Sequence, residues 1–432
     1  FLKIDMKVTN LFKIEKIPFI LLIFFPISII IGQAAISINY FLLAICFFFF
    51  LGNNEFKLLL KKYFFFILPF FLIIIFSSLF NQDKYSLHNL DKSFFYLKNF
   101  FLFFVLIFIL KNEYYRKIFY YVILCCCIFV AADNFIQFFF GVDIFGYEKA
   151  KYRLTGPFGD NEYVSGSYLA KLSILISPLL LIKKNFSKNY YFYFFIFFIF
   201  CSIILTGERA STLIFSIGII FFYYLLDRKL KKIFILFSLF AFILITLVTF
   251  NKTVKYKFLQ TSYQVGLLKY FGNKITVSEK DYPDFENRNF FDSNHGAHFL
   301  TAYEIWKKNK LIGVGLKNFS KECKNDDYKN INSLSFDKRC SSHPHNFYLE
   351  LLSEFGLTGF ILFFLIILKI YNIYQMSLFK ENIFLKASLC QLVTVLWPIT
   401  STGSIISNFN GSFIWINLAL FVLICEYGYK NE

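Results

Sequence analysis

The fold is decided by stretches such as Tyr190-Tyr-Phe-Tyr-Phe-Phe-Ile-Phe-Phe-Ile-Phe-Cys-Ser-Ile-Ile-Leu-Thr206, in which 17 consecutive residues carry no charge. A helix must run for about 20 mostly apolar residues to cross the hydrocarbon core of a bilayer. A second uncharged stretch, 210–226, begins after only three intervening residues. The two stretches therefore predict two antiparallel membrane-spanning helices joined by a tight hairpin.

Apolar stretches of this kind recur along the whole chain. Of the 432 residues, 57% are hydrophobic and 22% aromatic, which is more apolar surface than a soluble domain of this size can bury. We predict an all-α integral membrane protein with about twelve transmembrane helices. The predicted spans lie near 17–32, 34–51, 63–80, 94–110, 118–141, 163–182, 190–206, 210–226, 233–250, 357–374, 384–400 and 411–427.

One long hydrophilic segment interrupts the series of spans. The predicted organisation is nine transmembrane helices in residues 1–250, one large external loop in 251–345, and three transmembrane helices in 346–432. Within the loop, the apolar residues from His298 to Asn309 fit an amphipathic helix. We therefore expect the loop to contain short helices.

The positively charged residues predict the orientation of the bundle. With the N-terminus inside, the inner segments contain 21 lysine and arginine residues, and the short outer loops contain 6. Since inner loops carry the excess of such residues, both termini are expected in the cytoplasm and the large loop outside. The same lysines account for the net charge of +17, and we predict no nucleic-acid partner. The apolar stretch 17–31 is followed by no small-residue cleavage site, so we expect no cleavable signal peptide.

Two ionisable residues lie inside predicted spans. Asp133 and Lys171 are each about eight residues from the outer end of adjacent antiparallel spans, which places both roughly 12 Å deep. Such residues are costly in a membrane and usually face a partner or a cavity. We expect the two side chains to pair or to line one polar pocket. A substrate role and an ion pair that only fixes helix register both remain open.

Arginine is rare in this chain, and two of the six arginines lie in short outer loops. Arg153 follows Tyr152 in a turn rich in Gly and Pro, and Arg209 lies in the hairpin Thr206-Gly-Glu-Arg-Ala-Ser211. Lysine is sufficient to set topology, whereas the planar guanidinium group can hold phosphate oxygens in two places. Both arginines therefore suit a lipid-linked phosphate at the outer membrane surface. Neutralisation of Arg209 by its neighbour Glu208 is the alternative.

The large loop ends in His343-Pro-His-Asn346, directly before an apolar helical pattern. A histidine at such a helix start can accept a proton from a hydroxyl nucleophile near neutral pH, so we predict a catalytic or substrate-binding role for His345. His-x-His also suggests metal binding, but two ligands without a nearby carboxylate or third histidine make a weak site, and we predict no metal. Glu350 and Glu354 on the following helix are most simply surface charges.

Two of the nine cysteines, Cys323 and Cys340, fall in the large loop. An oxidising exterior would allow a disulfide between them, which closes a short loop just before the histidines. The alternative is a pair of free thiols that are neighbours only in sequence.

Three segments carry a resemblance to a known family. They are Arg153-Leu-Thr-Gly-Pro-Phe-Gly-Asp-Asn161, the segment from Trp306 through Leu311-Ile-Gly-Val-Gly-Leu-Lys-Asn-Phe319, and His345-Asn-x-Tyr-Leu-x-x-Leu-x-Glu-x-Gly356-Leu-Thr-Gly359. Together with the twelve spans and the long loop before the last three, they resemble the O-antigen ligase and O-antigen polymerase superfamily of bacterial inner-membrane glycosyltransferases. The hairpin at Arg209 is also similar to a turn of that family.

The resemblance implies transfer of a glycan from an undecaprenyl-pyrophosphate carrier to a lipid A–core or glycan acceptor, among membrane lipids, on the periplasmic face. It implies no cofactor. Carried over by position, Arg153 and Arg209 hold the pyrophosphate, His345 activates the acceptor hydroxyl, and Asn346 and His343 orient it. One departure is His298, which stands where relatives commonly carry an arginine. Arg288 is then the substitute for a third cation.

Several functions remain open at this point. The spacing His-Asn-x9-Gly-x-x-Gly resembles the ligases more than the polymerases, which extend one lipid-linked chain with another repeat. A lipid-linked oligosaccharide flippase or secondary transporter is less well supported, because no two-fold repeat is visible and the polar elements cluster on the outer side. A purely structural membrane component leaves the arginine hairpins unexplained.

Overall fold

The computed structural model describes residues 15–81, 88–181, 189–226, 252–271, 288–329, 331, 333–399, 401 and 403–429. Within these ranges all regular secondary structure is helical, and the only β-type pairings are two isolated bridges. The prediction of an all-helical protein is confirmed for this part of the chain.

Among the described residues, seven helices are long and apolar enough to cross a membrane. They are α2 (Gln33–Phe50), α3 (Asn54–Phe80), α4 (His88–Tyr96) continued by α5 (Lys98–Leu110), α6 (Glu113–Phe140), α9 (Arg209–Leu226), α15 (Phe347–Met376) and α17 (Asn408–Tyr427). Shorter apolar helices are α1 (Lys16–Ile31), α7 (Ser165–Ile176) with η2 (Ser177–Leu180), α8 (Tyr190–Leu205) and α16 (Ile383–Val395). Each predicted span within the described ranges overlaps one of these helices, whereas the span predicted at 233–250 lies outside the described residues.

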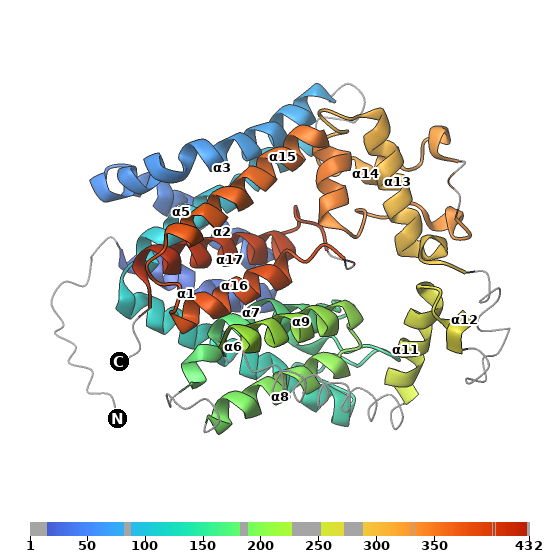
Figure 1. Cartoon of the computed structure of the whole chain (residues 1–432), viewed down its shortest axis with the longest axis horizontal. Helices are drawn as coiled ribbons and strands as arrows, with labels where there is room; N and C mark the ends of the chain where they lie inside the picture. Colours follow the sequence, from blue (N-terminus) through green and yellow to red (C-terminus); the bar gives the residue numbers. More distant parts are fainter. Residues whose placement is uncertain are drawn as a thin grey trace.

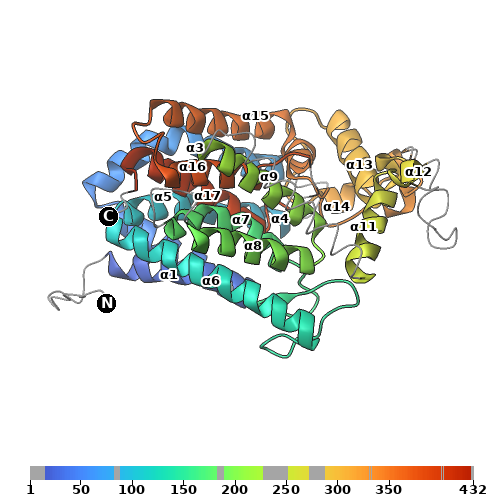
Figure 2. The ribbon, with the colours of Figure 1, turned by 60° about the horizontal axis from the view of Figure 1, so that its bottom comes forward.

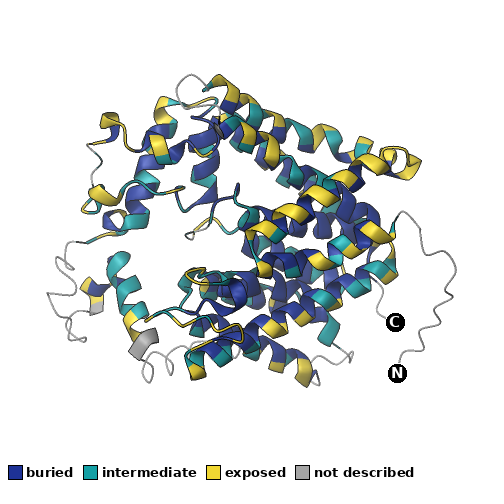
Figure 3. Cartoon of the chain, turned by 180° about the vertical axis from the view of Figure 1, so that it is seen from behind, coloured by how far each residue is buried: buried dark blue, intermediate teal, exposed yellow. Residues whose placement is uncertain are grey.

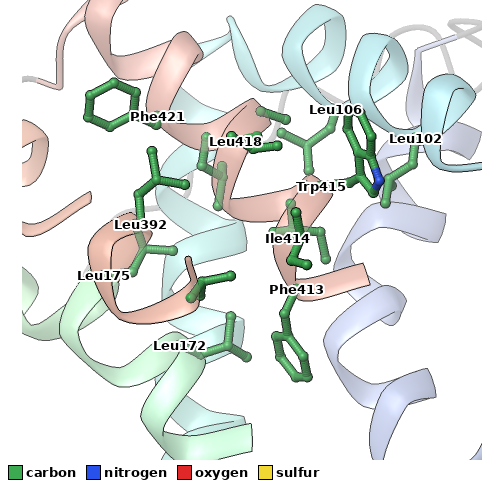
Figure 4. Packing of buried hydrophobic residues seen from close by; sticks show 14 of the residues in the cluster. Leu102, Leu106, Leu172, Leu175, Leu392, Phe413, Ile414, Trp415, Leu418 and Phe421 are labelled. Atoms are coloured by element: carbon green, nitrogen blue, oxygen red, sulfur yellow. The ribbon is translucent and has the colours of Figure 1, made fainter. Parts of the chain in front are cut away.

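Helix α17 forms the centre of the bundle. Figure 4 shows Trp415 and Leu418 of this helix packed among side chains of α5, including Leu102 and Leu106. Nearly every residue of α17 is buried, which agrees with a sequence that is apolar on all sides. Helices α5, α16, α15 and α2 pack against α17.

The outward faces of the surrounding helices are apolar as well. Large side chains such as Phe65 of α3, Phe49 of α2 and Phe194 of α8 are 74%, 72% and 69% exposed. Figure 3 shows exposed positions along the outer faces and buried positions inside. A bundle with aromatic residues on both its inside and its outside suits a lipid environment.

The loop elements gather at one end of the bundle, which we call the loop end. They include α11 (Lys252–Gln264), α12 (Leu268–Phe271), α13 (Asn294–Lys308) and α14 (Phe319–Glu322), at the right of Figures 1 and 2. Helix α17 ends at the opposite end, where Glu426 pairs with Lys62 (2.6 Å). The residues discussed below as a candidate site lie at the loop end.

Candidate functional site

A Gly-x-Gly segment of the loop fixes the first turns of α15. The Gly315 amide donates a hydrogen bond to the Glu354 carbonyl (2.8 Å). A Cβ atom on Gly313 would lie 2.3 Å from the Glu354 carbonyl carbon, so this approach requires glycine. Helix α15 bends at Gly356, whose φ of +65° lies in the left-handed region. The segment after the histidines is thereby held against the loop.

The last turn of α3 attaches this segment to the bundle. The Ser77 hydroxyl donates to the Ile312 carbonyl (2.6 Å), and the Asn81 amide group donates to the Gly313 carbonyl (3.1 Å). Because these bonds join residues more than 230 positions apart in the sequence, they connect the loop to the membrane helices.

Two carboxylates of α15, predicted to be surface charges, are buried and bind backbone instead. Glu350 accepts from the Ile405 amide (2.9 Å), and Glu354 accepts from the Lys317 amide (2.8 Å). Both residues are almost fully buried. The surface-charge interpretation is wrong because α15 lies under the loop here, so that its carboxylates satisfy buried amides.

Asn346 caps α15 and fixes the position of the residue before it. Its Oδ1 accepts from the amides of Tyr348 (3.1 Å) and Leu349 (3.2 Å), and its Nδ2 donates to the Pro398 carbonyl (2.8 Å). His345 has a φ of +58°, which is uncommon for a residue with a side chain and is found at strained functional positions. With both polar atoms of its side chain engaged, Asn346 is arranged to position His345.

Four histidines from two segments meet beside the start of α15. His295 and His298 lie one turn apart on α13, and His343 and His345 come from the end of the loop. The ring centroid of His345 lies 4.3 Å from that of His343, 4.9 Å from that of His295 and 5.1 Å from that of His298. Candidate ligand nitrogens of His295, His298 and His345 all lie within 4.8 Å of one another, so these residues could hold a metal ion. We call the four residues the histidine cluster.

Burial lowers the pKa of His295, His298 and His345 and so favours their neutral form. It lowers the pKa of His345 to about 3 and that of His295 to about 4, and the other histidines act in the same direction. Arg209 and Arg153 lower the pKa of His295 further. A neutral imidazole offers a lone pair, and the lowered pKa makes it a weak base until negative charge is brought close to it.

The two arginine-bearing segments pack against each other. A Cβ atom on Gly207 would lie 2.8 Å from the Tyr152 carbonyl oxygen, and the Leu154 amide donates to the Thr206 carbonyl (3.3 Å). From α6, Gln137 accepts two backbone amides of the turn that follows Arg153 (3.0 Å each). The turn and the hairpin are thus held as one unit.

Arg153 and Arg209 line a pocket of about 340 Å³, which we call the arginine pocket. Arg209 donates to the Thr261 hydroxyl of α11 (2.5 Å). Burial, with the charges of Arg153 and Arg209 nearby, lowers the pKa of Lys257 on the same helix to about 8. His295 also lines this pocket, so the two arginines meet the histidine cluster there, and Lys257 lies near the charges of both arginines.

A second pocket, of about 270 Å³, lies on the bundle side of the cluster, and we call it the bundle pocket. His343 and His345 line it together with Lys171 and Asn410. The bundle pocket adjoins the arginine pocket, because the two share five lining residues: Tyr163, Glu208, Ala210, Ser211 and Ser401. A molecule held by the arginines can therefore extend toward His345.

A third pocket, of about 510 Å³, is lined by Lys92, Lys317 and Lys321, and we call it the lysine pocket. It meets the bundle pocket at His343 and Asn410, and no acidic side chain is among its described lining residues. The histidine cluster thus lies where pockets with two kinds of cation approach each other.

The predicted pairing of Asp133 with Lys171 is wrong. Asp133 accepts from the Ile144 amide (2.9 Å), because α6 turns it toward the loop that follows. Lys171 donates to Asn410 of α17, and its Nζ lies 5.6 Å from the ring centre of Phe409. Lys171 lines the bundle pocket, whereas Asp133 lines none of the three pockets described above.

Arg288 is engaged by protein groups. Its guanidinium donates to the Tyr263 hydroxyl (2.6 Å) and the Asp292 carbonyl (2.7 Å) and lies over the Tyr263 ring. It lines none of the three pockets, and Lys257 is the cation found beside Arg153 and Arg209.

Glu208 also binds elsewhere than at its neighbour. Its carboxylate accepts from the Gly166 amide at the start of α7 (2.7 Å) and from the Ser211 hydroxyl (2.9 Å). Between these two described residues, Glu208 and Arg209, there is no ion pair. The Arg209 charge is therefore available to the pocket.

Cys323 and Cys340 are joined in a disulfide, with Cα atoms 5.4 Å apart. The Arg339 Nε donates to the Cys323 carbonyl (3.0 Å) beside the bond. The cross-link ends three residues before His343, so it shortens the free part of the chain that leads to the cluster.

Two residues of the site, Lys257 and His295, were not predicted from the sequence. His295 is three residues before His298, and that spacing on a helix was the one available signal. Lys257 is one of 16 basic residues in the loop, and nothing in its local sequence distinguishes it.

The fold and the site define a polytopic helical membrane protein with a cation-lined, histidine-containing cleft at one end of the bundle. Residues 194–364 match the family model described as O-antigen ligase, and this stretch, which includes Arg209, α13 and the histidine cluster, is an O-antigen ligase domain. That family transfers lipid-linked glycans in the bacterial inner membrane, and the apolar helices among the described residues are those of a multi-pass membrane protein. No match is found among curated proteins.

Proposed function

We propose that the protein is a ligase that transfers a glycan from undecaprenyl pyrophosphate to a lipid A–core acceptor. The observation that carries this proposal is the position of His345 between a pocket lined by arginines and one lined by lysines. The family match supports the donor class, because it covers Arg209 and the histidine cluster.

The donor pyrophosphate binds in the arginine pocket. Arg153 and Arg209 hold its oxygens, with Lys257 as a third charge. Guanidinium groups bind such oxygens in two places, and fixed cations stabilise the negative charge that develops on the leaving group. The carbon–oxygen bond between the sugar and the pyrophosphate breaks, and the pyrophosphate leaves with its lipid.

His345 accepts the proton of the attacking hydroxyl. The acceptor oxygen forms the new bond to the anomeric carbon, and the proton moves to the imidazole. In the free protein, burial favours the neutral ring, so a lone pair is available. The bound pyrophosphate brings negative charge to the neighbouring pocket, which favours the imidazolium and strengthens the base.

The lysine pocket binds the acceptor. Lys92, Lys317 and Lys321 suit a molecule with phosphate groups, and the pocket reaches the cluster at His343. Lipid A–core carries phosphates and must present one hydroxyl at His345. A polymerase would instead bring a second pyrophosphate-linked glycan to this side.

The orientation of the chain is part of the proposal. About twelve transmembrane helices, with both termini in the cytoplasm, place the loop end and the site in the periplasm. The described end of α17 lies at the opposite end of the bundle from α13, the helix that carries His295 and His298, which supports this arrangement.

The test is deletion of the gene in its own bacterium, followed by gel analysis of lipopolysaccharide and extraction of lipid-linked glycans. We expect loss of attached O-antigen together with accumulation of the lipid-linked polymer. A band of core plus one repeat indicates a polymerase instead. Unchanged lipopolysaccharide contradicts both activities.

A further inference from the structure

The histidine cluster has a geometry that proton transfer alone does not require. One imidazole is sufficient to accept a proton, yet nitrogens of His295, His298 and His345 converge within 4.8 Å of one another. Nitrogens bound to one tetrahedral zinc ion at about 2.0–2.1 Å lie roughly 3.4 Å apart. Small side-chain rotations would bring all three onto one ion.

His298 has the surroundings of a metal ligand. It is only 6% exposed, and its buried Nδ1 has no hydrogen-bond partner in the described structure. The ring also hydrogen-bonds the backbone of Lys338. Ligating histidines usually donate their second ring N–H to such a group, which fixes the tautomer and aims the free nitrogen at the ion.

His295 and His345 complete a ligand set from two segments. His295 lies three residues before His298 on one helix face, and its buried Nδ1 likewise has no hydrogen-bond partner among the described residues. The backbone of His345, held at φ +58°, presents its ring to both. The third ligand that the His-x-His sequence lacked thus comes from α13.

We infer that His295, His298 and His345 form a binding site for a divalent transition metal ion such as Zn²⁺, and that the bound ion blocks glycan transfer. Three neutral imidazoles with an open fourth position are a recognised zinc donor set. The inhibitory half rests on the proposed function, because coordination occupies the lone pair with which His345 accepts a proton. Arg153 and Arg209 line the same pocket as His295, and their positive charges oppose a bound cation, which favours reversible occupancy.

Binding is tested on the purified full-length chain in detergent, with Co²⁺ as a spectroscopic probe and Zn²⁺ as competitor. We expect nitrogen-coordinated Co²⁺ absorption that saturates at one equivalent and is displaced by Zn²⁺. His295→Ala and His298→Ala should each weaken binding at least tenfold. The matched control is Glu304→Gln. It removes an exposed carboxylate of the same helix, which pairs with Lys307. This variant should bind Co²⁺ as the parent does.

The site is overturned if no one-equivalent absorption develops, or if it persists in both histidine variants. Gel filtration checks that the variants remain folded, and His298→Gln offers a milder replacement of similar size. This readout needs no glycan substrate, so it stands or fails separately from the proposed function.

Inhibition is tested by glycan transfer with and without saturating Zn²⁺. In the parent we expect Zn²⁺ to lower the transfer rate at least tenfold and a chelator to restore it. In His298→Gln the transfer rates with and without Zn²⁺ should be nearly equal. Metal binding without inhibition overturns the regulatory half. A parent that transfers no glycan under any condition overturns the proposed function and leaves the Co²⁺ result intact.

Discussion

The arginine pocket and the lysine pocket lie on two sides of the histidine cluster but hold their charges differently. Arg153 and Arg209 lie on two short segments that pack on each other and on α6, and Arg209 is further bound to α11. The lysines come from α4 and from the loop around α14, and Lys317 is exposed. The arginine pocket, at about 340 Å³, also has a smaller volume than the lysine pocket, at about 510 Å³.

The difference indicates how each substrate is recognised. Planar guanidinium groups on a packed scaffold suit one small group of defined geometry, such as a pyrophosphate. Ammonium groups on flexible stems in a pocket of larger volume suit a large anionic molecule whose phosphates vary in position. The donor is therefore expected to depend on geometry, and the acceptor on charge.

The largest effect tests the residue between the two pockets. His345→Ala should lower the transfer rate about 10³-fold, since general-base catalysis contributes roughly 10²–10⁴-fold. The measurement is transfer of labelled glycan from lipid-linked donor by membranes with matched amounts of protein. Retention of more than half of the parental rate would remove His345 as the base.

Exchange of the two kinds of cation tests the comparison directly. Arg209→Lys should lower transfer by roughly 10–100-fold, because a charge-assisted bond is worth about 1.5–3 kcal/mol and lysine cannot bind in two places. The reciprocal change, Lys317→Arg, keeps charge in a pocket that needs only charge and should cost less than about threefold. Equal losses in the two variants would show that the pockets do not differ in this way.

Charge removal in the lysine pocket should act on the acceptor alone. The double variant Lys92→Gln/Lys321→Gln is expected to raise the KM for acceptor roughly tenfold, with little change in the KM for donor. Higher salt should raise the acceptor KM of the parent and have less effect on that of the variant, because exposed charges are screened. A rise in donor KM instead would assign this pocket to the donor.

The smallest effect is a pH dependence on the donor side. Because the pKa of Lys257 is lowered to about 8, its cation is present below that pH and is lost as the pH rises through it. We expect the donor KM to rise about threefold between pH 7 and pH 9. Lys257→Arg keeps the charge throughout and should give a flat profile. A similar rise in this variant would point to another group.

Much of the fold follows from local sequence. Uncharged runs such as 190–206 must be helical in a bilayer, since each backbone group needs an internal partner. The runs therefore predicted the helices α8 and α9 and the hairpin that carries Arg209 between them. His345 and Arg153 were likewise suggested by residue type at the end of a loop or turn.

Other parts depend on contacts between distant segments. The similar depth of Asp133 and Lys171 in their predicted spans suggested that the two side chains meet. Depth does not specify the direction in which each side chain points, and the two residues bind Ile144 and Asn410 instead. From its local sequence Glu350 is predicted to be a surface charge. In the folded chain its carboxylate accepts a hydrogen bond from the Ile405 amide.

Sequence by itself determined that this chain is a helical membrane protein with arginines and a histidine pair near the ends of its helices, because hydrophobic length and residue chemistry are local properties. Only the tertiary structure decided which residues share the site. It brings Lys257 to the arginines and His295 and His298 to His345 through the packing of α11 and α13, and no local pattern encodes that packing. The three-histidine geometry, and with it the inferred metal site, exists only in the folded chain.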